Sequence, residues 1–237
     1  MRPVLFEWMG VPWSSWHIFF ALGGISAALA FYGLLRRAKP AISSGSILMV
    51  FAGSYLWMMA GAILWPTLFE GFPSPARQFS LFQSVAMSSS GGILAGATGF
   101  VVMTLALGLR LGVLVDAGVS AALIAFGIGR LGCFLNGDDY GWMGGFPVQL
   151  IESSICLAGF VVLVNLKCRE AGQRGLYGVV LYACMRLATE PFRADWRGPP
   201  LHVSGLEFSP PQLVAAACLL CAFGAFAFMT RRRRTSP

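Results

Sequence analysis

Charged residues are scarce in this chain. They make up 11% of its 237 residues, and hydrophobic residues make up 57%. Soluble domains contain about 25% charged residues, so a soluble globular domain is excluded, as is a disordered chain. Histidine occurs only twice, and the six cysteines show no metal-ligand or disulfide spacing. We therefore expect an all-α, polytopic membrane protein with no metal and no cofactor.

The basic residues do not indicate nucleic-acid binding, although the net charge is +7. They lie in short clusters between apolar runs, which is the pattern that orients membrane helices. We expect membrane lipids around the chain and no nucleic acid as a partner.

Seven apolar stretches are long enough, or nearly so, to cross a hydrocarbon core that requires about 20 residues. We predict a bundle of about seven transmembrane helices in a single integral membrane domain, residues 1–237. Pro66 should end or kink the second helix, because proline lacks the backbone N–H. The predicted spans are Trp16–Leu35, Ile47–Leu68, Gly91–Leu109, Gly112–Ile128, Val148–Leu166, Gly175–Ala188 and Pro211–Met229.

The loops between these spans predict an orientation. Eleven of the seventeen basic residues fall on one side if all seven stretches span, and most acidic residues fall on the other. The positive-inside rule makes the basic side cytoplasmic. We expect a multi-pass protein of the bacterial cytoplasmic (inner) membrane with a cytoplasmic C-terminus. The stretch around Arg130 then faces the outer leaflet.

Arg130 stands in a glycine-rich polar stretch between two apolar segments. A charge near the bilayer centre costs roughly 2.5–3.5 kcal/mol on insertion scales, so an arginine kept there usually serves binding or transport. The alternative is an arginine that extends to the headgroups with its stem buried. A binding site is favoured by the polar and glycine neighbours of Arg130, among them Asn136 and Asp138. The sequence shows no obvious acidic partner for Arg130.

A second polar stripe follows on the sixth predicted span. Tyr182, Arg186 and Glu190 are spaced four residues apart and therefore share one helical face. Glu190 and Arg186 could simply neutralise each other within the bundle. If Arg186 and Arg130 instead converge, they suit a phosphate, which arginine binds through two parallel N–H bonds. The residues thus indicate an outward-facing site for a phospholipid headgroup, without indicating a reaction.

Four motifs resemble those of one enzyme family. The stretch GRLGCFLNGDDYG (129–141) is similar to the GRxGNFxNGExxG signature of prolipoprotein diacylglyceryl transferases. FPVQLIE (146–152) resembles the family's HPxQLYE, and the Tyr182-to-Arg193 stretch resembles YxxxRxxxEFxR. SSSGGI (88–93) resembles S-F/Y-H-G-G-L. The order, spacing and number of spans also agree, so the resemblance covers most of the chain.

The resemblance implies an activity. Family enzymes transfer the diacylglyceryl unit of phosphatidylglycerol to the lipobox cysteine of a secreted prolipoprotein and release glycerol phosphate. The resemblance also implies that Arg130 and Arg186 hold the phosphate and that Glu190 orients Arg186. Of the two carboxylates Asp138 and Glu190, Asp138 is then the better candidate base. The implied substrate-binding residues are Ser90, Gly91, Gly92, Cys133, Asn136, Gly137, Gly141, Gln149, Glu152, Tyr182 and Arg193. Among these, Gly91 and Gly92 would let the lipid approach the helix backbone, and Tyr182 would offer a hydroxyl.

The chain departs from the family pattern at four positions. Ser90 replaces a histidine, Cys133 an asparagine, Asp138 a glutamate and Phe146 a histidine. An acceptor thiol benefits from a base, and serine is not one at neutral pH. Two alternatives therefore stay open: an enzyme with another acceptor (a lipid, a sugar or a small thiol), and a catalytically silent phospholipid-binding protein. A channel or transporter is disfavoured, because no repeated broken helices are evident.

Overall fold

The computed structural model describes residues 3–8, 11–39, 41–69, 87–137, 147–193, 200–203 and 206–235. These residues form two compact units, which we describe separately. Unit 1 contains the N-terminal region to residue 40, residues 112–195 and the chain from Ala215 on. Unit 2 contains residues 41–111 and 196–214.

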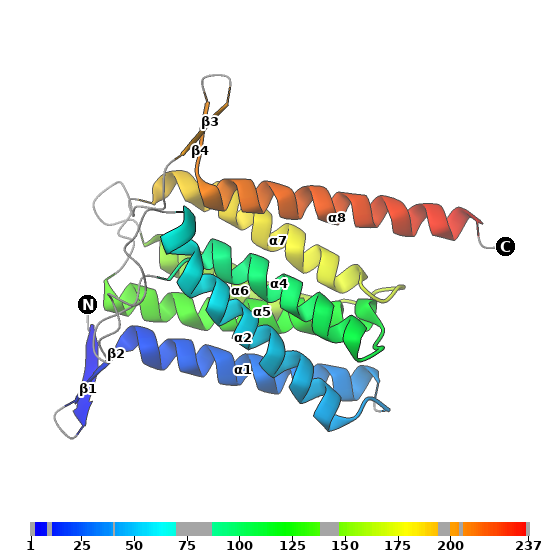
Figure 1. The fold of residues 1–237 in the computed structure, drawn as a ribbon, viewed down its shortest axis with the longest axis horizontal. Coiled ribbons are helices and arrows are strands. Elements are labelled where there is room, and N and C mark those ends of the chain that lie inside the picture. The colour runs from blue at the N-terminus through cyan, green and yellow to red at the C-terminus, as the bar shows by residue number, and fades with distance from the viewer. Residues whose placement is uncertain are drawn as a thin grey trace. The chain divides into compact units, whose positions relative to one another are not determined.

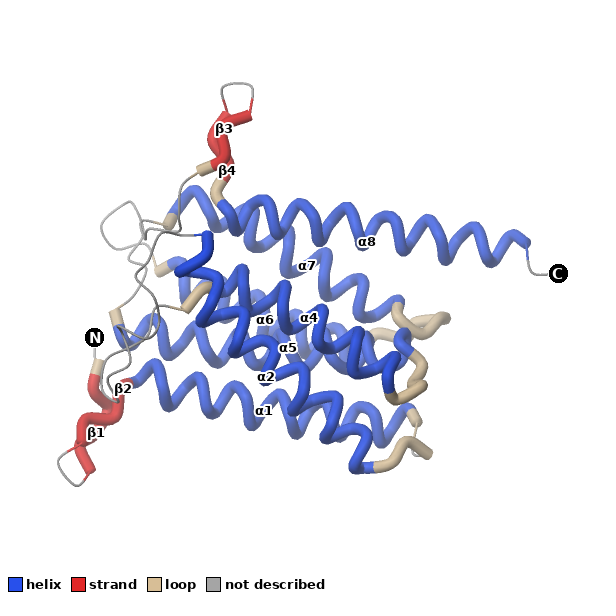
Figure 2. Tube along the Cα trace, in the orientation of Figure 1, coloured by secondary structure: helices blue, strands red, loops and turns tan. Residues whose placement is uncertain are grey.

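Unit 1 is built from four helices and most of a fifth, with a short antiparallel hairpin before the first (Figures 1 and 2). Its strands are β1 (Val4–Trp8) and β2 (Val11–Ser14). Its helices are α1 (Ser15–Ala38), α5 (Leu111–Asn136), α6 (Val148–Asn165) and α7 (Gln173–Thr189), followed by the 3-10 turn η1 (Glu190–Phe192), and α8 (Pro210–Thr235) from Ala215 on.

The helix ends of unit 1 gather in two groups. The C-termini of α5 and α7 lie with the N-terminus of α6, since Arg130 and Arg186 both contact Glu152. At the opposite end, Lys39, Arg169 and Arg174 line one cavity. The basic residues that follow α1 and α6 therefore share one end of this unit, in agreement with the predicted charge clustering.

The core of unit 1 lies between α5, α6 and α7. Leu123, Cys156, Leu163 and Met185 are buried there, and partly buried aromatic rings such as Phe160 pack against them. This core fixes the three helices that carry the polar residues at their ends.

Unit 2 pairs α2 (Ser44–Phe69) with α4 (Ser89–Ala106), which lie side by side (Figure 1). It also holds the hairpin of β3 (Leu201–Val203) and β4 (Leu206–Phe208). The helices cross closely at Gly91, where an added Cβ would collide with Trp65 and with the carbonyl oxygen of Gly61. The resemblance implies that this glycine lets the lipid approach the backbone, whereas the structure places α2 against it.

Pro66 does not end α2, and the kink expected as the alternative stays a prediction. The helix continues for three residues to Phe69. Without an N–H at Pro66, the carbonyl oxygen of Ala62 lacks its helical donor. The backbone N–H of Ser88 donates to that oxygen instead, at 2.9 Å. The break in the hydrogen-bond ladder is therefore satisfied from outside the helix.

Six of the described helices are long and apolar enough to cross a membrane, namely α1, α2, α4, α5, α6 and α8. Many of their large apolar side chains are exposed, such as Leu29 at 69% and Leu220 at 73%, as lipid-facing side chains are. The remaining predicted span corresponds to α7, a helix of 17 residues. The fold confirms an all-α, multi-pass membrane protein, and the two short hairpins were not predicted.

Candidate functional site

Arg130 lies within a helix rather than in the loop after it. The predicted span ended at Ile128, but α5 continues to Asn136. Gly137 then ends the helix with a φ of 91°, a conformation that favours glycine, and its N–H donates to the carbonyl oxygen of Cys133 at 3.0 Å. The signature glycine at this position therefore has a structural reason.

Two further glycines of the same stretch bring neighbouring helices close to Arg130. A Cβ at Gly132 would lie 2.6 Å from the Cβ of Phe19 on α1. A Cβ at Gly127 would lie 2.8 Å from Leu157 Cγ on α6. Real Cβ atoms do not approach so closely, so a larger residue at either position would force a neighbouring side chain or helix to shift. The resulting packing leaves the Arg130 residue only 7% exposed.

Glu152 is the centre of the charged cluster. It is fully buried on the first turns of α6. Its Oε2 lies 2.6 Å from Arg130 Nε and 3.4 Å from Arg193 Nη1, and its Oε1 accepts from Arg186 Nη1 at 2.9 Å. The structure thus brings Arg130 and Arg186 together and gives Arg130 an acidic partner, which the sequence analysis had not recognised.

Arg186 contacts the expected partner, Glu190, and also Glu152. Its contact with Glu190, Nη2 to Oε2, measures 3.6 Å, longer than its hydrogen bond to Glu152. Thr189 Oγ1 donates to the same Glu152 oxygen at 2.8 Å. Thr189 is not among the predicted site residues, although its position seven residues after Tyr182 places it on the same helical face.

Aromatic rings cover one side of the cluster. The guanidinium carbon of Arg130 lies 5.0 Å from the ring centre of Phe126, within cation–π range. The ring of Phe126 in turn meets Tyr182 edge to face at 5.1 Å. The hydroxyl of Tyr182 is buried and has no hydrogen-bond partner among the described residues.

The remaining predicted site residues fall in three groups. Cys133 and Asn136 lie half-buried in the last two turns of α5, and Gln149 is fully buried on α6. Ser90, Gly91 and Gly92 are buried at the start of α4 and belong to unit 2. Asp138, Gly141 and Phe146 lie outside the described residues.

The cluster has the chemistry of an oxyanion site. Three guanidinium groups from α5, α7 and the segment after η1 meet at one carboxylate. Guanidinium has five N–H donors whose fork matches carboxylate and phosphate oxygens alike, and its attraction to an anion is stronger in a buried setting than in water. Within the described parts of the chain, His, Cys, Asp and Glu side chains form no group of three that could hold a metal ion.

Comparisons with known proteins point to one family. The family model described as prolipoprotein diacylglyceryl transferase matches residues 3–228. Phosphatidylglycerol–prolipoprotein diacylglyceryl transferases from two strains of Dehalococcoides mccartyi are 28% identical over 131 residues, which is 46% of this chain and 50% of each relative. The enzyme of a third strain is 32% identical over 101 residues, 33% of this chain and 39% of the relative. The chain thus spans about half the length of the first two relatives.

Proposed function

The chain belongs to the prolipoprotein diacylglyceryl transferase family, and on this premise we propose that it transfers a diacylglyceryl group from phosphatidylglycerol to a prolipoprotein. The acceptor is the thiol of the lipobox cysteine. The observation that carries the proposal is the convergence of Arg130, Arg186 and Arg193 on Glu152.

The reaction is a substitution at carbon. The thiolate sulfur attacks the glyceryl methylene carbon that is bonded to the phosphate oxygen. A C–S bond forms, the C–O bond breaks, and glycerol phosphate leaves with the bonding electron pair. Negative charge therefore grows on the phosphate, and donors held in place before the reaction stabilise that growth.

The arginines supply this stabilisation. Arg130 and Arg186 bind the phosphate oxygens of the donor lipid and of the departing glycerol phosphate. Glu152 holds their guanidinium groups in position, and the Glu190 contact adds to the orientation of Arg186. Tyr182 offers its buried hydroxyl as a further donor to the headgroup. Asn136 and Asp138 shape the headgroup pocket.

The thiol proton requires an acceptor. Glu152 and Glu190 both contact arginines, so their carboxylates are engaged in ion pairs. Asp138 is therefore our proposed base. Asp138→Asn should abolish transfer while leaving phosphatidylglycerol binding nearly unchanged, and unchanged turnover would remove this assignment.

We also propose the placement of the chain in the membrane. It forms one integral domain of the bacterial inner membrane, with the arginine cluster toward the outer leaflet and the C-terminus in the cytoplasm. The motive is the clustering of basic residues at the opposite end of unit 1 from Glu152. A C-terminal reporter enzyme that is active only outside the cytoplasm would contradict this orientation.

The decisive experiment uses purified full-length chain, phosphatidylglycerol labelled in both glycerol units and a lipobox peptide. We expect release of glycerol phosphate together with transfer of the diacylglyceryl label to the peptide. Arg37→Gln, at an exposed position of α1, is the matched control for Arg130→Gln and should keep activity. Failure of both release and peptide labelling in the wild-type chain would contradict the proposed function.

The competing enzyme function is transfer of the same group to a different acceptor. The four departures from the family pattern favour it. Ser90 and Cys133 replace a histidine and an asparagine of the resemblance. Release of glycerol phosphate without labelling of the peptide would establish this alternative. Ser90→His should raise peptide labelling if only a base was lost, and no gain would favour the changed acceptor.

A further inference from the structure

Two arginines of the Glu152 cluster each follow an aromatic residue by four positions on their own helix. Phe126 precedes Arg130 on α5, and Tyr182 precedes Arg186 on α7. Residues four apart share one face of a helix. The two rings also meet each other, with 5.1 Å between their centroids and an interplanar angle of 87°. This pair of rings therefore joins the two helices that carry the arginines, one turn before the charged groups.

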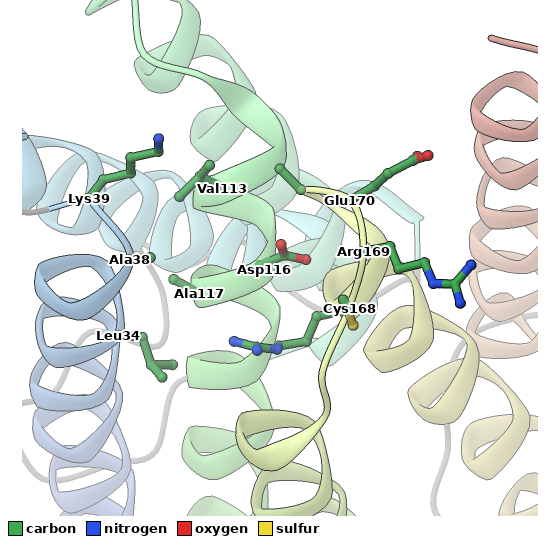
Figure 3. A pocket seen from close by; sticks show the side chains of 11 residues that line it. Leu34, Ala38, Lys39, Val113, Asp116, Ala117, Cys168, Arg169 and Glu170 are labelled. Atoms are coloured by element: carbon green, nitrogen blue, oxygen red, sulfur yellow. The ribbon is translucent and has the colours of Figure 1, made fainter. Parts of the chain in front are cut away.

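The same two helices are also joined at their other ends. Asp116 on α5 faces the start of α7 (Figure 3), where its carboxylate accepts the backbone N–H groups of Gly172 and Gly175 at 2.8 and 2.7 Å. Phe126 lies ten residues further along α5, which corresponds to about 15 Å of helix. The Asp116 contact thus aligns the two helices, whereas the orientation of a side chain near Phe126 depends on the contacts made there.

Two contacts of different kinds act on the guanidinium group of Arg130. Its Nε lies 2.6 Å from Glu152 Oε2, and its Cζ lies 5.0 Å from the ring centre of Phe126. The carboxylate neutralises positive charge, whereas a ring has no net charge and attracts a cation through the negative face of its quadrupole. The ring therefore stabilises an arginine that is only 7% exposed without reducing its charge for a phosphate.

Packing alone does not explain an aromatic residue at position 126. Phe126 is partly buried against the core of unit 1, but aliphatic side chains such as Ile155 and Leu181 cover the same core. A ring differs from these side chains in the charge distribution of its face, and that face lies against the charge of Arg130.

We propose that Phe126 is a positioning residue of the transfer reaction, whose ring holds the guanidinium group of Arg130 where it meets the phosphate. This inference rests on the function proposed above. Loss of the attraction between ring and cation lets the guanidinium group shift, and a misplacement of about 1 Å can cost roughly a hundredfold in rate. The loss should fall on kcat, because negative charge grows on the phosphate only as the C–O bond breaks.

Fluorinated phenylalanines separate the charge distribution of the ring from its shape. Each fluorine withdraws electron density from the ring face and weakens its attraction for a cation, while the ring keeps nearly the same size. Phe126 is replaced by its mono-, di- and trifluoro derivatives in the full-length chain, and transfer from phosphatidylglycerol to the lipobox peptide is measured in nanodiscs. We expect kcat to fall with each added fluorine, to about a tenth for the trifluoro ring, with KM for phosphatidylglycerol changed less than about twofold.

Phe160 is the matched control, because it packs against the same core from α6. Its fluorination should leave kcat unchanged. Phe126→Leu removes the ring but keeps an apolar side chain, and kcat should fall about as far as with the trifluoro ring. If Phe126→Leu fails to fold, the fluorinated series still decides the question, because it preserves the shape of the side chain.

Thermal unfolding tests the contact independently of the reaction. Trifluorination of Phe126 should lower Tm by a few degrees in the wild-type chain and by less in Arg130→Met, which has no cation at that position. Equal Tm shifts in the two backgrounds, or equal losses of kcat in the Phe126 and Phe160 series, would overturn the positioning role. A fluorinated series with unchanged kcat overturns this role alone, whereas a wild-type chain without transfer contradicts the proposed function and the role together.

Discussion

Replacing Glu152 by glutamine should destabilise the fold more than any other single loss of negative charge among the described residues. The carboxylate meets three guanidinium groups at 2.6, 2.9 and 3.4 Å. At an effective dielectric constant near 20, each contact gives roughly 5–6 kcal/mol of attraction before desolvation. Desolvation offsets most of this, and breaking a buried ion pair typically costs about 3–5 kcal/mol. We expect a loss in that range, because glutamine leaves buried guanidinium charges facing a neutral amide.

Thermal unfolding of the purified chain in detergent measures the effect. For a chain of this size, about 2–4 °C in Tm corresponds to 1 kcal/mol, so Tm should fall by roughly 6 °C or more. Glu190→Gln is the matched control: it removes the same charge at a buried position whose contact with Arg186 is 3.6 Å. A Tm for Glu152→Gln at or above that of Glu190→Gln would refute the role of Glu152 as the centre of the cluster.

Three further predictions concern the same region. Gly132→Ala should lower Tm because its Cβ would lie 2.6 Å from that of Phe19, whereas Gly129→Ala, with nothing within 4 Å, should be neutral or raise stability by about 0.5–1 kcal/mol. Thr189→Val keeps the side-chain shape but removes a donor to Glu152, so it should cost about 1–3 kcal/mol in denaturant unfolding. Arg130→Lys should lower transfer to the lipobox peptide at least about tenfold in initial-rate assays, since lysine lacks the bidentate fork; retained activity would show that charge alone suffices.

The positions of the helices could be predicted from the sequence, whereas the residues at which they end were predicted less accurately. The length of each apolar stretch predicted the spans, because the thickness of the hydrocarbon core sets the length of a helix that crosses it. The extension of α5 to Asn136 was not predicted, because Arg130 and the glycines around it resemble a loop in composition. In the structure these glycines serve helix packing at Gly127 and Gly132. The continuation of α2 past Pro66 depends on the backbone N–H of Ser88. Hydrophobic periodicity gives no information about such a contact.

The site was predicted in its residue types but not in its pairing. Helical spacing placed Arg186 and Glu190 on one face, and that spacing favoured them as partners. The structure has this pair at 3.6 Å and adds a shorter contact from Arg186 to Glu152, a residue 34 positions earlier. Local spacing cannot predict such a partner, because only the packing of α6 against α7 brings the two helix ends together. Thr189, in contrast, lies on the same helical face as Tyr182, and its spacing could have indicated it.

The buried cluster and the departures from the family motifs consist of different residues. Arg130, Glu152, Arg186, Glu190 and Arg193 all match the family motifs that the sequence resembles, and these residues form the buried cluster. A carboxylate that assembles the guanidinium groups beforehand weakens their attraction for phosphate but removes the cost of ordering them when the lipid binds. Of the four departures, Ser90 belongs to unit 2, Cys133 makes none of the ion pairs of this cluster, and Asp138 and Phe146 lie outside the described residues. We therefore infer that recognition of the phosphate donor is kept in this chain, and that any divergence lies in how the acceptor is deprotonated or chosen.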